Sequence, residues 1–143
     1  MKFEFSAGGV VYKKDNGNIF ILMVQHGGYA HHWGFPKGHI ADTIKGETKE
    51  DAALREVKEE TGIDAKLLQA LAPIQFWYVR DEEKRKKTVY FFVMEYQGGD
   101  FSQKDFEMQD VQWIPIKDVL EKITFKSEKQ VFQEAKKYLQ TLK

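Results

Sequence analysis

The chain has 143 residues, with 22 Lys and Arg against 22 Asp and Glu and no Cys. This composition excludes disulfides and thiolate chemistry, and the balanced charge argues against general nucleic-acid binding through a strongly basic surface. The length predicts one domain over residues 1–143, and no apolar run has the form of a signal peptide or a membrane span, so we expect a soluble cytoplasmic protein without a membrane partner. Nothing in the sequence fixes the oligomeric state.

The first half of the chain predicts strands on both sides of one helix. Two apolar runs at 5–12 and 19–25 are separated by a polar turn and predict a β-hairpin. Good helix formers follow at 50–61. Strand-forming residues then occur at 67–79, where Pro73 interrupts them because proline cannot donate to a sheet ladder.

The second half predicts two strands and two helices. The apolar run at 88–96 is typical of a strand buried on both faces, whereas the mixed charges at 80–87 indicate a solvated hairpin turn before it. Contact of Arg85, Lys86 and Lys87 with a polyphosphate is the alternative for this charged run. A short strand at 111–114, a short helix at 116–122 and a final helix at 127–142 follow. The final helix has an apolar stripe at helical spacing, made of Val131, Ala135, Tyr138, Leu139 and Leu142.

Local chemistry marks both ends of the helix at 50–61. Thr48 followed by Asp51 forms a capping-box pattern, and Gly62 suits the left-handed residue just past a helix end. One side of the helix is small and apolar and would pack closely against a sheet. That side consists of Ala52, Ala53 and Val57.

Three carboxylates share the opposite side of this helix. Glu56 and Glu60 lie one turn apart, with Glu59 beside them, and like charges at this spacing destabilise an isolated helix. Mg²⁺ is a fitting partner because it prefers carboxylate oxygens and completes its coordination with water and phosphate oxygens. Mn²⁺ is the alternative metal. A solvated acidic face is the alternative interpretation.

The segments WGFPK at 33–37 and REVKEETGI at 55–63 resemble the Nudix hydrolases. The signature of that family is a glycine, five residues, a glutamate, seven residues and then REUxEExGU, where U is a bulky aliphatic residue. Every position from Glu47 onward matches, but eight residues separate Gly38 from Glu47. We expect the loop to bulge around 41–44; in the alternative alignment Ala41 takes the place of the glycine.

The resemblance implies an α/β fold, the Nudix-type α/β/α sandwich with a central mixed sheet. It makes Glu59 and Glu60 the main metal ligands and Glu56 a further ligand or the general base, and these roles are interchangeable. Arg55 is expected to pair with Glu47, a structural support, and to orient the acids. An ordinary surface ion pair is the alternative for Arg55.

Other candidates lie outside the helix. The Gly38 carbonyl is a candidate metal ligand and Lys37 a candidate phosphate contact, with solvent exposure as the alternative for Lys37. Glu107 stands six residues before Trp113. That spacing resembles nucleotide-hydrolysing Nudix proteins with an additional catalytic or metal-binding glutamate; a solvated loop acid is the alternative.

The runs HHWGFPKGH at 31–39 and KTVYFFVMEY at 87–96 are most similar to the diadenosine polyphosphate hydrolases and their diphosphoinositol polyphosphate relatives. Tyr78 and Tyr90 are candidates for stacking on adenine, and Lys87 for holding a distal phosphate. His39 is a candidate phosphate donor, a pH-sensitive group or a plain loop residue. For the tyrosines, packing in the core is the alternative.

The predicted activity is Mg²⁺-dependent hydrolysis of a nucleoside diphosphate linked to another moiety, with dinucleoside polyphosphates as the first choice of substrate. Within the enzyme class the alternatives are diphosphoinositol polyphosphates, ADP-ribose, damaged nucleoside triphosphates and the capped 5′ end of RNA, and a fold alone does not separate them. The alternative from another class is a Nudix-like module that senses a nucleotide without hydrolysing it. Against this alternative, every glutamate of the signature is present.

Overall fold

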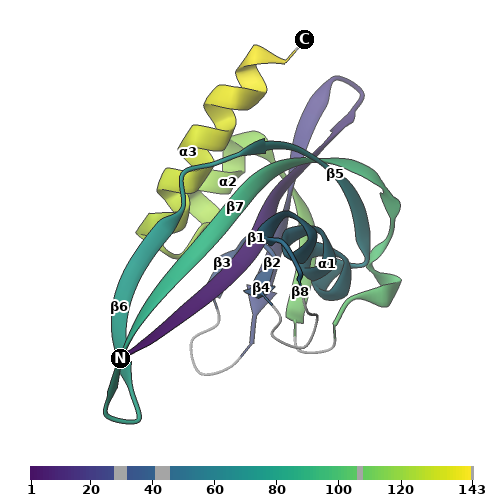
Figure 1. Cartoon of the computed structure of the whole chain (residues 1–143). Coiled ribbons are helices and arrows are strands. Elements are labelled where there is room, and N and C mark those ends of the chain that lie inside the picture. Colours follow the sequence, from purple (N-terminus) through teal and green to yellow (C-terminus); the bar gives the residue numbers. More distant parts are fainter. Residues whose placement is uncertain (28–31, 41–45, 106–107, 143) are drawn as a thin grey trace.

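The computed structural model describes residues 1–27, 32–40, 46–105 and 108–142. In this part of the chain, strands form one mixed eight-stranded sheet with helices on both faces (Figure 1). The main path through the sheet is, in spatial order, β3 (His32–Gly34), β2 (Asn18–His26), β1 (Lys2–Asp15), β7 (Glu83–Gly99) and β5 (Ile63–Ala70). Off this path, β4 (Lys37–His39) pairs with β1, β6 (Ile74–Arg80) with β7, and β8 (Met108–Pro115) with β2.

Strand β1 has two partners on one edge. Near its C-terminal end it pairs antiparallel with β2, from Tyr12 to Asp15. Nearer its start, from Ser6 to Gly8, it pairs antiparallel with β4. Its other edge runs parallel to β7 from Lys2 to Tyr12. The predicted hairpin is confirmed, and the change of partner places β4 beside the middle of the sheet.

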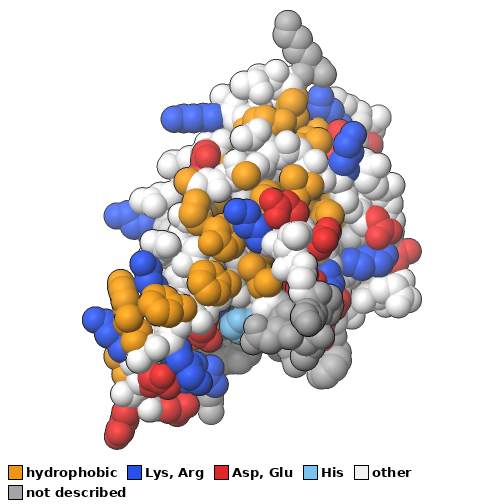
Figure 2. Space-filling view, viewed as in Figure 1, with side chains coloured by type: hydrophobic (Ala, Val, Ile, Leu, Met, Phe, Trp, Pro, Cys, Tyr) orange, Lys and Arg blue, Asp and Glu red, His pale blue; other side chains and the backbone are white. Residues whose placement is uncertain are grey.

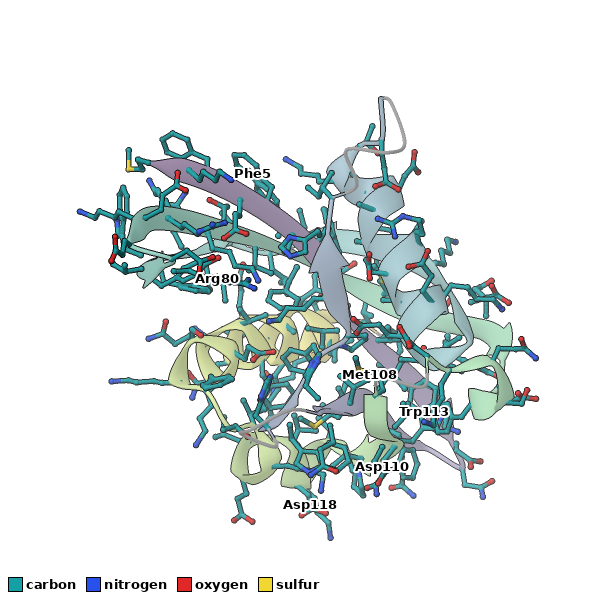
Figure 3. All side chains as sticks on the ribbon, turned by 90° about the horizontal axis from the view of Figure 1, so that it is seen from below. Phe5, Arg80, Met108, Asp110, Trp113 and Asp118 are labelled. Carbon is teal, nitrogen blue, oxygen red and sulfur yellow. The ribbon has the colours of Figure 1, made fainter. Side chains whose placement is uncertain are left out.

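The helices enclose this sheet as two outer layers. Helix α1 (Lys49–Thr61) lies on one face, and α2 (Ile116–Lys122) and α3 (Lys126–Thr141) lie on the other (Figure 3). Ala52, Ala53 and Val57 of α1 are fully buried against one core cluster, as predicted. The opposite cluster contains Val131, Phe132, Ala135 and Leu139 of α3. The α/β/α sandwich with a mixed sheet is therefore confirmed.

The ends of α1 form as the sequence predicts. The Thr48 hydroxyl accepts a hydrogen bond from the Asp51 backbone N–H at 3.1 Å. Gly62 ends the helix at φ 83° and donates its N–H to the Lys58 carbonyl. The predicted break at Pro73 is also confirmed, because β5 ends at Ala70 and β6 begins at Ile74. None of the helices in the described ranges is long and apolar enough to cross a membrane.

The hairpin turn predicted over 80–87 is present, but it is shorter than predicted. Only Asp81 and Glu82 make the turn, with positive φ values of 53° and 61°, and Glu83 already begins β7. The backbone of residues 85–88 is paired on both sides, by β6 and by the start of β1, whereas Glu83 and Lys84 pair with β6 alone. The charged side chains alternate between the two faces of this three-stranded ribbon, where Lys84 is exposed and Arg85, Lys86 and Lys87 are partly buried.

Candidate active site

The segment from Trp33 to His39 is held by two buried carboxylates from opposite layers. Glu60 of α1 accepts the backbone N–H of Lys37 at 3.0 Å. Glu128 of α3 accepts the backbone N–H of Phe35 at 3.1 Å. Both acids are almost completely buried, 7% and 3% exposed. The sequence analysis missed Glu128, whose only signal is its place in the first turn of α3.

Arg55 ties the acids of α1 to this segment. Its Nε and Nη2 bond to both carboxylate oxygens of Glu47, at 2.7 and 3.1 Å, so the predicted pair is present. Its Nη1 donates to Glu56 at 2.8 Å and to Glu59 at 3.0 Å. Its Nη2 also donates to the His39 carbonyl at 3.1 Å. The hydrogen bonds to Glu47 raise the pKa of Arg55, so the guanidinium is a permanent cation that orients the acids.

The three carboxylates of α1 differ in exposure. The side chain of Glu59 is 55% exposed, that of Glu56 is 13% exposed, and Glu60 is buried. Burial raises the pKa of Glu60 to about 8, against the lowering effect of the Lys37 N–H. Burial also raises the pKa of Glu56, in spite of its bond to Arg55. A uniformly solvated acidic face is therefore not what the helix presents.

Gly38 lies directly against Glu56. A Cβ atom built on Gly38 would stand 2.1 Å from the Glu56 Oε2 atom, which is closer than non-bonded atoms approach. Only glycine leaves room for this carboxylate beside the backbone of β4. The structure thus brings together two of the predicted metal ligands, one from a helix and one from a strand.

These residues fit a hard divalent cation by the chemistry of their donors. Glu56, Glu59, Glu60 and the Gly38 backbone offer only oxygen, and two of the carboxylates are buried where an uncompensated charge is costly. Within residues 1–27, 32–40, 46–105 and 108–142, no three acidic, histidine or cysteine side chains are already gathered as a metal centre. One nitrogen of Arg55 instead bonds to both Glu56 and Glu59.

A hollow of about 270 Å³ opens beside β1, where β4 is its partner. It contains Glu60 together with three of the predicted substrate-binding residues, Lys37, His39 and Lys87. Its remaining lining residues are Ser6, His26 and Gly38. A larger hollow of about 470 Å³ near the end of α3 contains none of the acids of α1.

The hollow is rich in cations and hydrogen-bond donors. Burial lowers the pKa of Lys87, and the nearby charge of Lys37 lowers it further. Burial lowers the pKa of His26 to about 4, with further lowering by Lys37 and His32. The Ser6 hydroxyl and the His26 Nε2 atom are buried without a hydrogen-bond partner among the described residues. Ser6 and His26 had not been predicted from the sequence, because no spacing distinguishes them from other strand residues.

The structure separates the two candidate tyrosines. By the register of β6 and β7, Tyr78 lies on the same face of the sheet as Lys87, and its hydroxyl donates to Glu4. Tyr90 lies on the other face against the cluster under α1, with the Lys49 ammonium 4.9 Å from its ring. Tyr90 is therefore not brought to the hollow. Glu107 and the expected insertion at 41–44 lie outside the described residues.

Comparison with known proteins identifies the family. The model of the NUDIX domain matches residues 2–135. The chain belongs to the NUDIX domain family. Curated relatives include the putative mutator protein MutT4 of Mycobacterium tuberculosis, 38% identical over 110 residues, which cover 77% of this chain and 43% of that protein. The asymmetrical bis(5′-nucleosyl)-tetraphosphatase of Sus scrofa is 33% identical over 133 residues, covering 91% of this chain and 87% of that enzyme.

Solved structures show the same Nudix fold. The C. elegans Ap4A hydrolase in a binary complex aligns with a TM-score of 0.72 at 24% identity, covering 97% of this chain and 99% of that chain. The NUDIX domain of Shewanella oneidensis NrtR in complex with ADP ribose aligns with a TM-score of 0.75 at 22% identity, covering 97% of this chain and 89% of that chain. The resemblance drawn from the signature residues is confirmed, and the chain is a Nudix hydrolase.

Proposed function

We propose that this Nudix hydrolase cleaves dinucleoside polyphosphates asymmetrically, with diadenosine tetraphosphate as the representative substrate and ATP and AMP as products. The observation that carries the proposal is the shared hollow. Two lysines, Lys37 and Lys87, face into the same space as Glu60, next to Glu56 and Gly38. A site for breaking a diphosphate bond needs such cations beside metal-binding acids.

The acids of α1 and the Gly38 carbonyl would hold Mg²⁺, with Mn²⁺ as the alternative. When bound, the cation would neutralise the phosphate oxygens and lower the pKa of a water molecule. Arg55 and Glu47 fix the directions of Glu56 and Glu59. One of the three acids, Glu56, Glu59 or Glu60, takes the proton of the attacking water.

The remaining groups of the hollow bind the polyphosphate away from the bond that breaks. Lys37 and Lys87 neutralise its charge, and His39 lies at the same opening. The unpartnered Ser6 hydroxyl can donate a hydrogen bond to a phosphate group. Two cations and this hydroxyl suit a chain of several phosphates better than a single diphosphate.

The aromatic residues beside Lys87 on β6 suit a nucleoside. Tyr78 and Phe76 lie on the same face as Lys87, with their ring centroids 6.2 Å apart. Phe76 is exposed, so its ring is open to a flat partner. We assign the stacking of adenine to Tyr78 with Phe76, and we do not assign it to Tyr90.

A second candidate is the hydrolysis of damaged nucleoside triphosphates. MutT4 is described as a putative mutator protein, and a relative from Mycolicibacterium smegmatis, 30% identical over 101 residues, is an 8-oxo-(d)GTP phosphatase. This chain spans only 43% and 29% of those two proteins. The tetraphosphatases, in contrast, match over most of their length.

The test is product analysis by chromatography after incubation with diadenosine tetraphosphate and Mg²⁺. The proposal predicts ATP and AMP as products, and no products with Glu60→Gln or after chelation of the metal. Parallel incubations with 8-oxo-dGTP, ADP-ribose and a diphosphoinositol polyphosphate rank the other substrates. Preferred cleavage of any of these three would overturn the choice of substrate, and turnover by Glu60→Gln at the rate of the unsubstituted protein would overturn the metal site.

Lys86 provides a matched control for the phosphate-binding role of Lys87. The two lysines are adjacent on β7 but point to opposite faces of the sheet. Lys87→Gln should raise KM for diadenosine tetraphosphate about tenfold or more, because a charge-assisted contact is lost. Lys86→Gln should leave KM unchanged. Equal effects of the two substitutions would contradict the assignment of Lys87.

A further inference from the structure

The ribbon formed by the start of β1, β6 and the start of β7 has an exposed aromatic face on the side of the sheet where α1 lies. Hydrophobic side chains gather over this end of the molecule in Figure 2, with both basic and acidic side chains around them. Phe5, labelled in Figure 3, points away from α3. We call the ribbon face the surface made by Phe3, Phe5, Trp77, Val79, Lys84 and Lys86.

The strand register sets the arrangement of this face. Phe3 on β1 and Trp77 on β6 both pair with Lys86 on β7, so one lysine stands between two rings. Lys84 is the next residue of β7 on the same face and pairs with Val79. The Lys84 and Lys86 ammonium groups lie 4.6 and 5.5 Å from the centroid of the Trp77 ring. The face thus alternates exposed rings with cations.

The acids of the ribbon point to the opposite face. Glu4 accepts the Tyr78 hydroxyl there and lies 3.8 Å from Arg85. Glu83 lies 3.9 Å from the same arginine. Residues 2–5, 74–80 and 83–88 are all described, and at these strand positions no carboxylate lies on the ribbon face. The exposed acids Asp81 and Glu82 lie in the turn at the end of the ribbon. The chain as a whole is electrically balanced, but the strand positions of this face carry only positive charge.

We propose that the ribbon face binds single-stranded nucleic acid, with bases stacked on Trp77, Phe3 and Phe5 and with phosphates against Lys84 and Lys86. Sequence-tolerant binding of single strands needs these two elements, aromatic platforms and nearby cations. Phe3 and Phe5 are two residues apart on one strand, about 7 Å, so adjacent bases of an extended chain can each meet a ring. Phe3, Phe5 and Trp77 are 59%, 46% and 49% exposed, and the two ammonium groups over the Trp77 ring would move to the phosphates when a base stacks on it.

Charge disfavours a second copy of the chain as the occupant. A two-fold interface would place the ribbon face against itself, bringing Lys84 and Lys86 near their own copies. No carboxylate on this described face would pair with them. A polyanion, in contrast, is complementary to every charge on the ribbon face.

This inference does not depend on the proposed hydrolysis, because the ribbon face and the hollow use opposite sides of β7. The test measures fluorescence anisotropy with oligothymidylate and oligouridylate of about 12 nucleotides. Each carries a 5′-hydroxyl and a 3′-fluorescein, so that no terminal phosphate is offered to the hollow. We expect binding that weakens between about 50 and about 200 mM salt, and much weaker binding of the corresponding duplex.

Substitutions on the two sides of the ribbon separate the two sites. Trp77→Ala should weaken binding about fivefold or more. Lys84→Gln with Lys86→Gln should lower the slope of log affinity against log salt by about 2. Lys87→Gln, on the other face, and Phe125→Ala, an exposed ring outside the ribbon, should not change binding. Trp77→Ala should keep the hydrolytic rate of the unsubstituted protein, which also shows that the variant folds.

Five results would overturn the inference. They are no binding of either oligonucleotide, unchanged binding by Trp77→Ala, duplex binding equal to single-strand binding, a dimer in solution that Trp77→Ala dissociates, and binding to vesicles of anionic lipid in place of the oligonucleotides. Quenching of the Trp77 emission by the oligonucleotide, taken as the difference from Trp77→Phe, would support it.

Discussion

Helices α1 and α3 make the same hydrogen bond to one segment from opposite sides, but with different surroundings. Glu60 of α1 and Glu128 of α3 each accept one backbone N–H, from Lys37 and Phe35. Glu60 borders an open hollow that also contains Lys37 and Lys87. Glu128 lies below Gly34, whose missing Cβ leaves room for the carboxylate. The comparison teaches that a buried carboxylate is a candidate catalytic group when it borders open space and other charges, and otherwise a structural support.

The largest expected effect is on turnover, from Glu60→Gln. The amide oxygen can still accept the Lys37 N–H, so the thermal midpoint should stay within a few degrees. The lost carboxylate should reduce kcat by at least about 100-fold. Substituting a residue that only hydrogen-bonds to a metal ligand already lowers metal affinity or activity about 10–100-fold. Steady-state kinetics and thermal unfolding of the same preparation measure both. A large loss of stability with unchanged kcat would make Glu60 a support like Glu128.

Two glycines that each lie against a carboxylate, Gly38 against Glu56 and Gly34 against Glu128, provide a matched pair. Gly38→Ala places a methyl group on the Glu56 carboxylate and should lower kcat about tenfold or more. Gly34→Ala places a methyl group 2.6 Å from the buried Glu128 carboxylate and should mainly lower the free energy of unfolding. Chemical denaturation and kinetics on both variants test the contrast. If Gly38→Ala retained full activity, the predicted role of Glu56 would fail.

Glu128→Ala should cost stability more than catalysis. It leaves the Phe35 N–H buried without a partner and removes buried volume, which together cost about 1–3 kcal/mol. Glu128→Gln is the control, because the amide oxygen can still accept that N–H. Urea denaturation should therefore show a loss for Ala and a smaller one for Gln. An unchanged midpoint for Glu128→Ala would show that the bond to Phe35 contributes little.

A further effect is expected on the pH dependence of stability, through His26. Its pKa is lowered to about 4 by burial in the folded protein, whereas in the unfolded chain it has the ordinary value of 6.5. Between pH 6.5 and about 4, His26 therefore binds a proton in the unfolded state but not in the folded state. Stability that is present above pH 6.5 is lost as the pH falls toward 4.

Thermal unfolding across this pH range measures the effect of His26. His26→Gln should reduce the change of the thermal midpoint with pH. His39→Gln should not reduce it, because His39 is exposed at the edge of the same hollow. Parallel curves for His26→Gln and the unsubstituted protein would contradict the assignment.

Local patterns predicted much of the fold. The cap at Thr48 and the end at Gly62 depend on residues close in sequence, and each is present. The Arg55–Glu47 pair, implied by the Nudix resemblance, is also present. The hairpin turn over 80–87 was predicted too long, because the strand at 85–88 also pairs with Lys2–Phe5, about 80 residues away in the chain. The role of Glu128 also depends on a distant segment, 93 residues from Phe35. The burial of Glu60 could not be predicted, because helical periodicity shows which side chains share a face but not how far each is buried from solvent.

The long parallel pairing of β1 with β7 has a consequence for the order in which the protein forms. All the acids of α1 and the whole segment Trp33–His39 are synthesised within the first 62 residues, but Ser6 and Lys87 meet only after β7 has left the ribosome. Contacts between such distant residues are slow to close. A nascent or truncated chain that contains every signature residue but not β7 would therefore lack Lys87 and the strand beside Ser6 in the hollow. Activity should appear only after β7 has joined the sheet.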